Sequence, residues 1–289
     1  MNDDRLKIAL CNEVLQPLPF GRQCEIAKAL GYDGLELAPF TVSEAPEAMT
    51  EQQARDTARM AADHGLVITG LHWLLVKPAG LSITTTDSGL HNKTVAFMQH
   101  LCALAEAMGA RYLVHGSPGQ RAIASDQTHA AALARASEAF AQAGEAARKH
   151  GVVYCIEPLS RDQTPIINTV AEAAEIVRAI GNPHLRTMID TSSAGLAETE
   201  PLPDLIARWM PTGLIAHVQV NDPNRRAPGQ GDMRFAPILR ALLAARAAGH
   251  YDGIVAAEPF DYVPDGMGSA AFSAAYLKGL IEALEHDNG

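Results

Sequence analysis

Short, continuous runs of apolar residues alternate with longer, alanine-rich amphipathic stretches along the whole of this sequence. Runs that are apolar throughout are typical of parallel strands whose two faces are covered by helices. The predicted strands are 6–11, 34–37, 67–75, 112–115, 152–157, 186–190, 214–220 and 253–258. The predicted helices lie near 20–30, 50–64, 88–108, 127–149, 169–180, 202–209, 235–248 and 269–285.

Eight strand–helix units in 289 residues fit a closed (β/α)8 barrel. The competing fold is an open, doubly wound sheet, which normally carries a glycine-rich phosphate loop after its first strand. Here the first predicted strand is followed by Asn12, Glu13 and Val14, without such a loop. No linker or low-complexity tract divides the chain. We therefore predict a single TIM-barrel domain over residues 1–289.

The overall charge and the cysteine usage restrict the partners and the compartment. The formal net charge of −10 argues against a nucleic-acid-binding surface, which would need clustered lysine and arginine. The four cysteines are far apart and mostly in apolar runs, as in reduced cytoplasmic proteins. We expect no signal peptide, because the first residues lack its basic-then-apolar pattern, and no membrane span, because the apolar runs are too short. We expect a cytoplasmic homo-oligomer (dimer or tetramer) that binds a small molecule.

Polar residues stand in or at the end of the last four apolar runs, one on each predicted strand: Glu157, Asp190, His217 and Glu258. Taken singly, such an acid is more often a helix N-cap, and such a histidine a hydrogen-bonded core residue. Together, they would converge at the mouth of a barrel, where the carboxylates would repel one another without a cation. This oxygen-rich set favours Mn²⁺, with Mg²⁺, Co²⁺ and Zn²⁺ as alternatives. We expect no cysteine ligand, because Cys155, near these strand ends, alternates to the other face.

The same stretches resemble a known superfamily. The motifs are Glu157-Pro158-Leu159, Met188-Ile189-Asp190-Thr191, His217-Val218-Gln219, residues 224–231 (NRRAPGQG) and Glu258-Pro259-Phe260. They resemble the xylose-isomerase-like sugar isomerases and epimerases, and among these the ketose 3-epimerases of the D-tagatose 3-epimerase kind. The resemblance implies one divalent metal with four protein ligands, of which the two glutamates also move protons: Glu157, Asp190, His217 and Glu258. It also implies that Arg225 contacts the substrate.

Two positions depart from the resembled family where the polar end of the substrate would lie. The family has a glutamate where this chain has Gln163, and a histidine where it has Ser193. We expect both residues to contact the substrate, with the change of residue type altering which substrate is taken. We also expect His72, Trp73 and His115 to line the pocket, because they stand at the ends of the third and fourth predicted strands. Core packing is the alternative for Trp73.

Two further features have a plain structural interpretation. Glu36 ends the second predicted strand, and we expect it to cap a loop rather than to enter the pocket. The segment 77–87 is long for a connection of this kind. It fits either a lid over the site or a surface turn that ends in a helix N-cap at Thr86 or Asp87.

The chemistry implied by the resemblance is proton transfer at a carbon next to a carbonyl, with a metal stabilising the developing enediolate. The first hypothesis is an isomerase or epimerase of a ketose or keto-polyol. A lyase or dehydratase acting on a keto-sugar or keto-inositol would use the same site. A DNA-repair endonuclease would need more histidine ligands and a basic groove, and a non-catalytic barrel would not need two acid/base glutamates. We expect no phosphate on the substrate, because Arg225 and Arg226 are the only clustered cations near the usual phosphate site.

Overall fold

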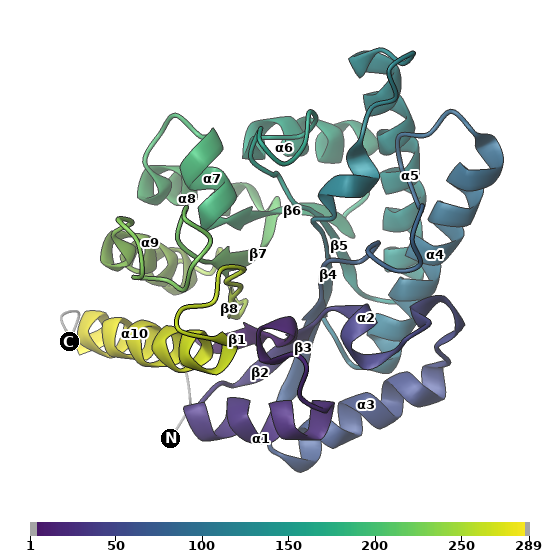
Figure 1. The fold of residues 1–289 in the computed structure, drawn as a ribbon. Coiled ribbons are helices and arrows are strands. Elements are labelled where there is room, and N and C mark those ends of the chain that lie inside the picture. The colour runs from purple at the N-terminus through teal and green to yellow at the C-terminus, as the bar shows by residue number, and fades with distance from the viewer. Residues whose placement is uncertain (1–4, 287–289) are drawn as a thin grey trace.

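The computed structural model describes residues 5–286, in which eight parallel strands close into a barrel in sequence order. Figure 1 shows the strands at the centre and the helices around them. This confirms the predicted TIM-barrel fold. The strands are β1 (Ile8–Cys11), β2 (Gly34–Leu37), β3 (Val67–Leu71), β4 (Tyr112–His115), β5 (Val153–Ile156), β6 (Leu185–Asp190), β7 (Ile215–Val220) and β8 (Val255–Ala257).

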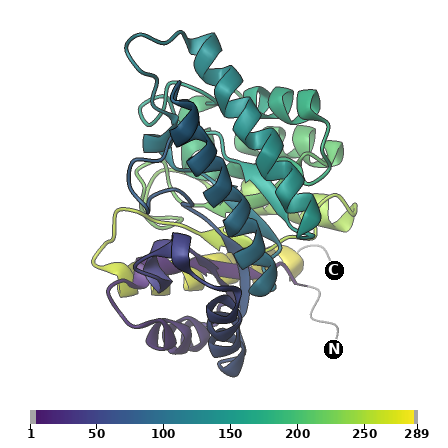
Figure 2. The ribbon, with the colours of Figure 1, turned by 90° about the vertical axis from the view of Figure 1, so that its right-hand side faces the viewer.

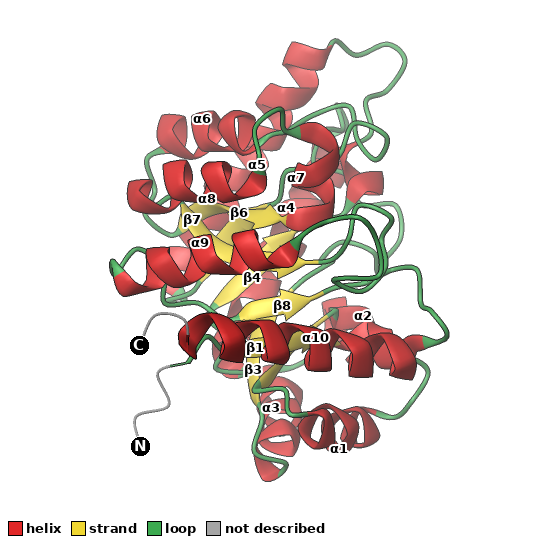
Figure 3. Ribbon diagram, turned by 90° about the vertical axis from the view of Figure 1, so that its left-hand side faces the viewer, coloured by secondary structure: helices red, strands yellow, loops and turns green. Residues whose placement is uncertain are grey.

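The long helices form the outer layer of the barrel, as the views from two opposite sides show (Figures 2 and 3). All eight predicted helices are present, and α2 and α7 were not predicted. The α-helices are α1 (Phe20–Leu30), α2 (Pro39–Val42), α3 (Glu51–Asp63), α4 (Ser88–Ala107), α5 (His129–Lys149), α6 (Val170–Ile180), α7 (Thr191–Ala197), α8 (Leu202–Trp209), α9 (Phe235–Ala247) and α10 (Gly266–His286). Four short 3₁₀ helices lie in the loops: η1 (Asn12–Leu15), η2 (Pro46–Ala48), η3 (Pro118–Arg121) and η4 (Met210–Thr212). Within the described residues, no helix has the length and apolar character that a membrane span requires.

The helix ends follow from local sequence. Thr50 and Gln53 form a capping box at the start of α3, in which each side chain bonds to the other residue's backbone N–H. Asp87 caps α4 by accepting a hydrogen bond from the backbone N–H of Leu90 at 2.9 Å, which agrees with the surface-turn interpretation of the preceding segment. Gly31 ends α1 with a φ of 82°, a conformation that residues with a Cβ adopt only with strain.

Strand β3 is shorter than predicted, and its sequence shapes the inside of the barrel. It ends at Leu71, and Trp73 then takes a φ of 49°, which is incompatible with a continued strand. Within β3, Gly70 faces the ring of Tyr112, and a Cβ at this position would overlap the ring. The missing side chain lets the bulky Tyr112 lie inside the barrel. Tyr112 thereby reaches the polar groups described below.

Candidate active site

A cavity of about 250 Å³ opens where the carboxyl ends of the barrel strands meet. In TIM barrels this end carries the active site. The cavity is small compared with the ~300–1,000 Å³ of typical ligand pockets, so it suits a small ligand. Its walls are Trp73, Gly116, Pro118, Glu157, Leu159, Gln163, Asp190, Ser192, Ser193, Asn221, Arg225, Glu258 and Phe260.

Three acidic side chains converge in this cavity: Glu157, Asp190 and Glu258. Asp190 is the last residue of β6, and each glutamate directly follows the last residue of its strand, β5 or β8. Their carboxylate oxygens lie within 4.8 Å of one another, and all three residues are buried. Gly116 makes room for this arrangement, because a Cβ there would overlap the carboxylate of Glu157.

Burial and mutual repulsion make these three carboxyl groups hard to ionise. Burial, followed by the charges of Glu258 and Asp190, raises the pKa of Glu157 well above its ordinary value. Burial raises the pKa of Asp190 to about 6, although Ser193 donates a hydrogen bond to it. Burial also raises the pKa of Glu258 to about 8, against the opposing effect of His72. Such a group holds its negative charges together only when a cation compensates them.

The surroundings of Asp190 test whether a cation fits. Its Oδ1 accepts a hydrogen bond from the backbone N–H of Ser193 at 2.6 Å, at the start of α7. Its Oδ2 is buried and has no hydrogen-bond partner among the described residues. A buried carboxylate oxygen without a donor is costly, and a bound cation removes that cost. The three acids therefore fit a divalent cation, with Asp190 Oδ2 among its ligand atoms.

The structure does not bring His217, the nitrogen ligand expected from sequence, together with these three acids. On β7 it is in register with Met188, whereas Gln219 is in register with Asp190. His217 thus lies one layer deeper in the barrel than the carboxylates. Its Nε2 is 2.8 Å from Glu36 Oε2, and its ring stacks on that of Tyr112 with centroids 3.9 Å apart.

Glu36 is the centre of this deeper layer, rather than the loop cap that the sequence suggested. It is fully buried, and its Oε2 also accepts a hydrogen bond from the Tyr112 hydroxyl at 2.6 Å. Its Oε1 accepts a hydrogen bond from Gln219 Nε2 at 2.7 Å. Burial alone would raise the pKa of Glu36, but His217, His72 and the Tyr112 hydroxyl together lower it to about 2. Glu36 is therefore an ionised, well-satisfied carboxylate inside the barrel.

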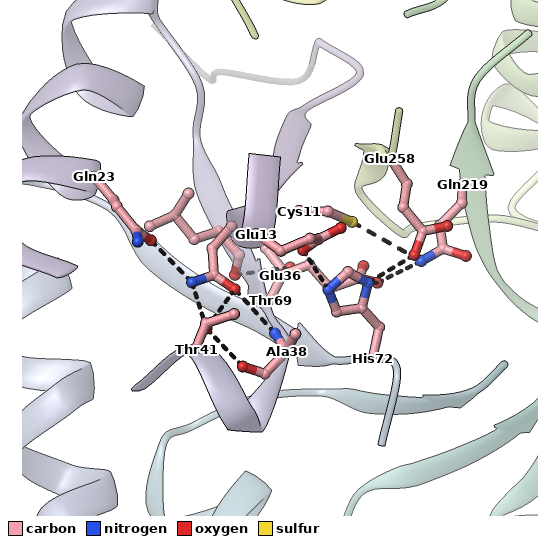
Figure 4. A network of polar contacts seen from close by, with 12 residues as sticks. Cys11, Glu13, Gln23, Glu36, Ala38, Thr41, Thr69, His72, Gln219 and Glu258 are labelled. Atoms are coloured by element: carbon pink, nitrogen blue, oxygen red, sulfur yellow. Dashed lines mark hydrogen bonds and ion pairs between the residues drawn. The ribbon is translucent and has the colours of Figure 1, made fainter. Parts of the chain in front are cut away.

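His72 connects the two layers (Figure 4). Its Nδ1 is 2.8 Å from Glu258 Oε1 and 3.5 Å from Glu36 Oε1, and its Nε2 is 2.8 Å from Glu13 Oε2. Burial would lower the pKa of His72, but Glu13 and Glu258 raise it well above its ordinary value. His72 thus contacts Glu258 without lining the cavity, and this contact holds Glu258 in place.

Sequence reasoning missed Glu13 and Cys11. Ligand atoms of these residues, His72 and Glu258 lie within 4.8 Å of one another, so the thiol of Cys11 lies close to Glu258. Cys11 is the last residue of β1 and Glu13 lies in η1 directly after it, where the sequence shows the same change from apolar to polar residues as at the other strand ends.

His115 lies outside the cavity, against the prediction that it lines it. Its Nδ1 is 2.8 Å from the Tyr154 hydroxyl, and burial, followed by the charge of Arg121, lowers the pKa of His115 well below its ordinary value. Arg121, also missed from sequence, is fully buried and donates to the backbone oxygens of His115 and Glu157. It therefore links the carboxyl ends of the neighbouring strands β4 and β5.

The other predicted pocket residues do line the cavity. Trp73 packs edge-on between Phe40 and Phe260, with ring centroids 5.5 Å and 5.4 Å away. Gln163 Nε2 donates to Ser160 Oγ at 2.9 Å. Arg225, with a φ of 66°, forms an ion pair with Asp162. Ser193 contributes the backbone N–H that holds Asp190.

Comparison with known proteins places this architecture in a family. Residues 24–280 match the model of the xylose isomerase-like TIM barrel, and the chain belongs to this family. It is 26% identical to a D-psicose 3-epimerase of Agrobacterium fabrum over 83% of this chain and 79% of that protein. Among solved structures, an L-ribulose 3-epimerase superposes with a TM-score of 0.81 at 19% identity, covering 98% of this chain and 97% of the other. A 3-keto-D-glucoside 4-epimerase from E. coli gives 0.80 at 20% identity, covering 95% and 100%.

Proposed function

We propose that this protein is a divalent-metal-dependent sugar epimerase or isomerase, which moves a proton at the carbon beside the carbonyl of a ketose or keto-polyol. The observation that carries the proposal is the buried group of Glu157, Asp190 and Glu258, with one carboxylate oxygen left without a donor. The names of the similar proteins, among them a D-psicose 3-epimerase and a 3-keto-D-glucoside 4-epimerase, support the same class of reaction.

Glu157, Asp190 and Glu258 would hold the cation, with Mn²⁺ or Mg²⁺ the ions that best suit carboxylate oxygens. When bound, a divalent cation acts as a Lewis acid toward the carbonyl oxygen of the substrate and so acidifies the neighbouring C–H.

Glu157 and Glu258 are the proposed proton carriers. They enter the cavity from β5 and β8, so a small substrate between them meets a carboxyl group from two directions. One carboxylate removes the proton, and the other carboxyl group returns one to the opposite face of the same carbon. His72 and Glu13 fix the position of Glu258, while Arg121 fixes the backbone of Glu157. Trp73 and Phe260 give the cavity an apolar wall that limits the access of water.

The cavity supports an unphosphorylated, monosaccharide-sized substrate. Arg225 is the only lysine or arginine among the described residues that line it, and Asp162 already neutralises that guanidinium. Gln163 and Ser193 add neutral hydrogen-bonding groups. A phosphate would need an unpaired cation or a glycine-rich cradle, and this cavity wall provides neither.

The deciding experiment incubates the Mn²⁺-loaded protein with a panel of ketoses and keto-polyols in D₂O. We expect deuterium at the carbon beside the carbonyl, together with the epimer or the aldose. Loss of water or of another β-substituent would instead support the lyase hypothesis. The proposed function is wrong if the wild type incorporates no deuterium into any substrate, or if Glu157→Gln incorporates deuterium at the same rate as the wild type.

A further inference from the structure

Gln219 of β7, in register with Asp190, carries a buried oxygen that has no hydrogen-bond partner among the described residues. The side chain is fully buried, and Oε1 has no hydrogen-bond partner among the residues that the structure describes. The amide nitrogen, in contrast, donates to Glu36 Oε1 at 2.7 Å and approaches the Cys11 Sγ at 3.9 Å. A buried amide oxygen without a donor costs free energy, so this atom needs an explanation.

The orientation of this amide is dictated by Glu36. Glu36 Oε2 accepts a hydrogen bond from the Tyr112 hydroxyl and lies 2.8 Å from His217 Nε2, so Oε1 is the oxygen that faces Gln219. An ionised carboxylate only accepts hydrogen bonds, so the NH₂ group of Gln219 must face it. The oxygen of the amide is therefore turned away from Glu36.

The strand register places Gln219 beside the carboxylate group. Gln219 is paired with Asp190 of the neighbouring strand β6. Paired residues on adjacent parallel strands direct their side chains to the same face of the sheet, which here is the inside of the barrel. Shared neighbours link Gln219 to Glu258 (Figure 4): Cys11 Sγ is 3.9 Å from Gln219 Nε2 and within 4.8 Å of a carboxylate oxygen of Glu258. His72 Nδ1 is 2.8 Å from Glu258 Oε1 and 3.5 Å from Glu36 Oε1, the atom that accepts the hydrogen bond from Gln219.

We propose that Gln219 Oε1 is the fourth protein ligand of the cation held by Glu157, Asp190 and Glu258. This inference rests on the metal dependence in the proposed function. It replaces the imidazole nitrogen expected from sequence with a neutral oxygen, so that all four protein ligands are oxygens. Glu36 then acts as a positioning residue, since it holds the amide with its oxygen outward. Such a ligand set favours Mg²⁺ and Mn²⁺, whereas a nitrogen ligand shifts preference toward Zn²⁺ and Co²⁺.

The test measures Mn²⁺ affinity directly, by following the EPR signal of free Mn²⁺ during titration of the metal-free full-length protein. Gln219→Leu removes the ligand oxygen, and we expect the Kd to rise about 10–100-fold, the range seen when groups around a metal site are removed. Gln219→His supplies a ring nitrogen and an N–H for Glu36, and we expect it to keep binding while its Zn²⁺/Mn²⁺ affinity ratio rises at least tenfold. Gln163→Leu, a glutamine on the cavity wall, is the matched control and should bind Mn²⁺ like the wild type.

The outcomes separate this inference from the proposed function. A folded Gln219→Leu variant with wild-type Kd would overturn the ligand role of Gln219, while a loss of binding in Asp190→Asn would still uphold the carboxylate site. Failure of the wild type to bind Mn²⁺ at all would overturn both. Should the leucine variant not fold, the histidine variant decides, because an unchanged Zn²⁺/Mn²⁺ ratio contradicts a ligand at this position.

Discussion

Two layers of the same barrel contain buried carboxylates, and the two layers differ in the polar groups that surround each carboxylate. In the deeper layer, Glu36 meets the Tyr112 hydroxyl, the Gln219 amide and His217, and its pKa is about 2. At the mouth, Asp190 has a pKa of about 6 and Glu258 one of about 8, and Asp190 retains an oxygen without a donor. Burial is nearly equal in the two layers. The hydrogen-bond donors around a carboxylate, rather than its burial, therefore distinguish a structural carboxylate such as Glu36 from one that is suited to bind a cation.

The largest expected effect concerns turnover at the mouth. Glu157→Gln and Glu258→Gln each keep an oxygen that can ligate, but an amide cannot accept and return a proton. We expect kcat to fall by about 10²–10⁴-fold in each variant at saturating metal, with a much smaller change in metal affinity. Steady-state kinetics at saturating Mn²⁺, with Mn²⁺ affinity measured in parallel, checks this. Near-normal kcat in both variants would remove the two-glutamate mechanism.

The second prediction contrasts the stability of the two layers in metal-free protein at pH 8. Glu36→Leu removes the buried acceptor that the Tyr112 hydroxyl, the Gln219 amide and His217 share, and we expect the free energy of unfolding to fall by about 3–5 kcal/mol. Glu157→Gln removes a carboxyl group whose ionisation is opposed by burial and by its acidic neighbours, and we expect it to raise the free energy of unfolding. Urea unfolding in the presence of a chelator measures both. The comparison between the layers fails if the two substitutions shift stability in the same direction.

The third prediction is a pH dependence that metal abolishes. Glu258 has a folded-state pKa of about 8, above its ordinary 4.5, so between these values the folded state binds more protons than the unfolded state. The metal-free protein therefore loses stability as the pH rises from about 5 to 8. Each 1 kcal/mol lost lowers the Tm by roughly 2–4 °C in a chain of this size.

Thermal unfolding with a chelator and with excess Mn²⁺ provides the measurement. With Mn²⁺ the slope should flatten or reverse, because metal binding requires the ionised carboxylates. Glu258→Gln should flatten it without metal. An equal fall of Tm with pH in metal-free wild type and Glu258→Gln would contradict the assignment of this shift to Glu258.

Much of the barrel could be predicted from sequence because each strand is a continuous apolar run that ends in a polar residue. That change identified Glu157, Asp190 and Glu258, and the structure brings these three together. The same pattern could not show whether His217 or Gln219 lies beside the three acids, because both face the barrel interior. Only the stagger between β6 and β7 shows that Gln219 lies level with Asp190. Stagger depends on strand tilt around the closed barrel, which no local pattern encodes.

The positions of two other residues, His115 and Arg121, could not be predicted from sequence for different reasons. His115 ends a strand like the others, yet Tyr154 and Arg121 hold it outside the cavity, and these contacts join elements far apart in sequence. Arg121 stands in a short 3₁₀ helix with no periodic pattern, so its complete burial was not visible from sequence. Long-range packing decides such positions.

The smallest expected effect lies at the rim of the mouth, where Arg225 is paired with the half-exposed Asp162. An exposed ion pair of this kind contributes only about 0–1 kcal/mol, so Asp162→Asn should change the free energy of unfolding by less than about 1 kcal/mol. The substitution frees the guanidinium, which lines the cavity and can then pair with an anionic substrate. We therefore expect the ratio of kcat/KM for a ketose phosphate to that for the free ketose to rise several-fold, with kcat for the free ketose within twofold of wild type. Asp261→Asn, which frees the neighbouring Arg226 outside the cavity wall, is the matched control and should leave this ratio unchanged. An equal rise in both variants would show that general surface charge, rather than the pairing of Arg225, sets the preference; a wild type that already favours the phosphate would refute the unphosphorylated substrate itself.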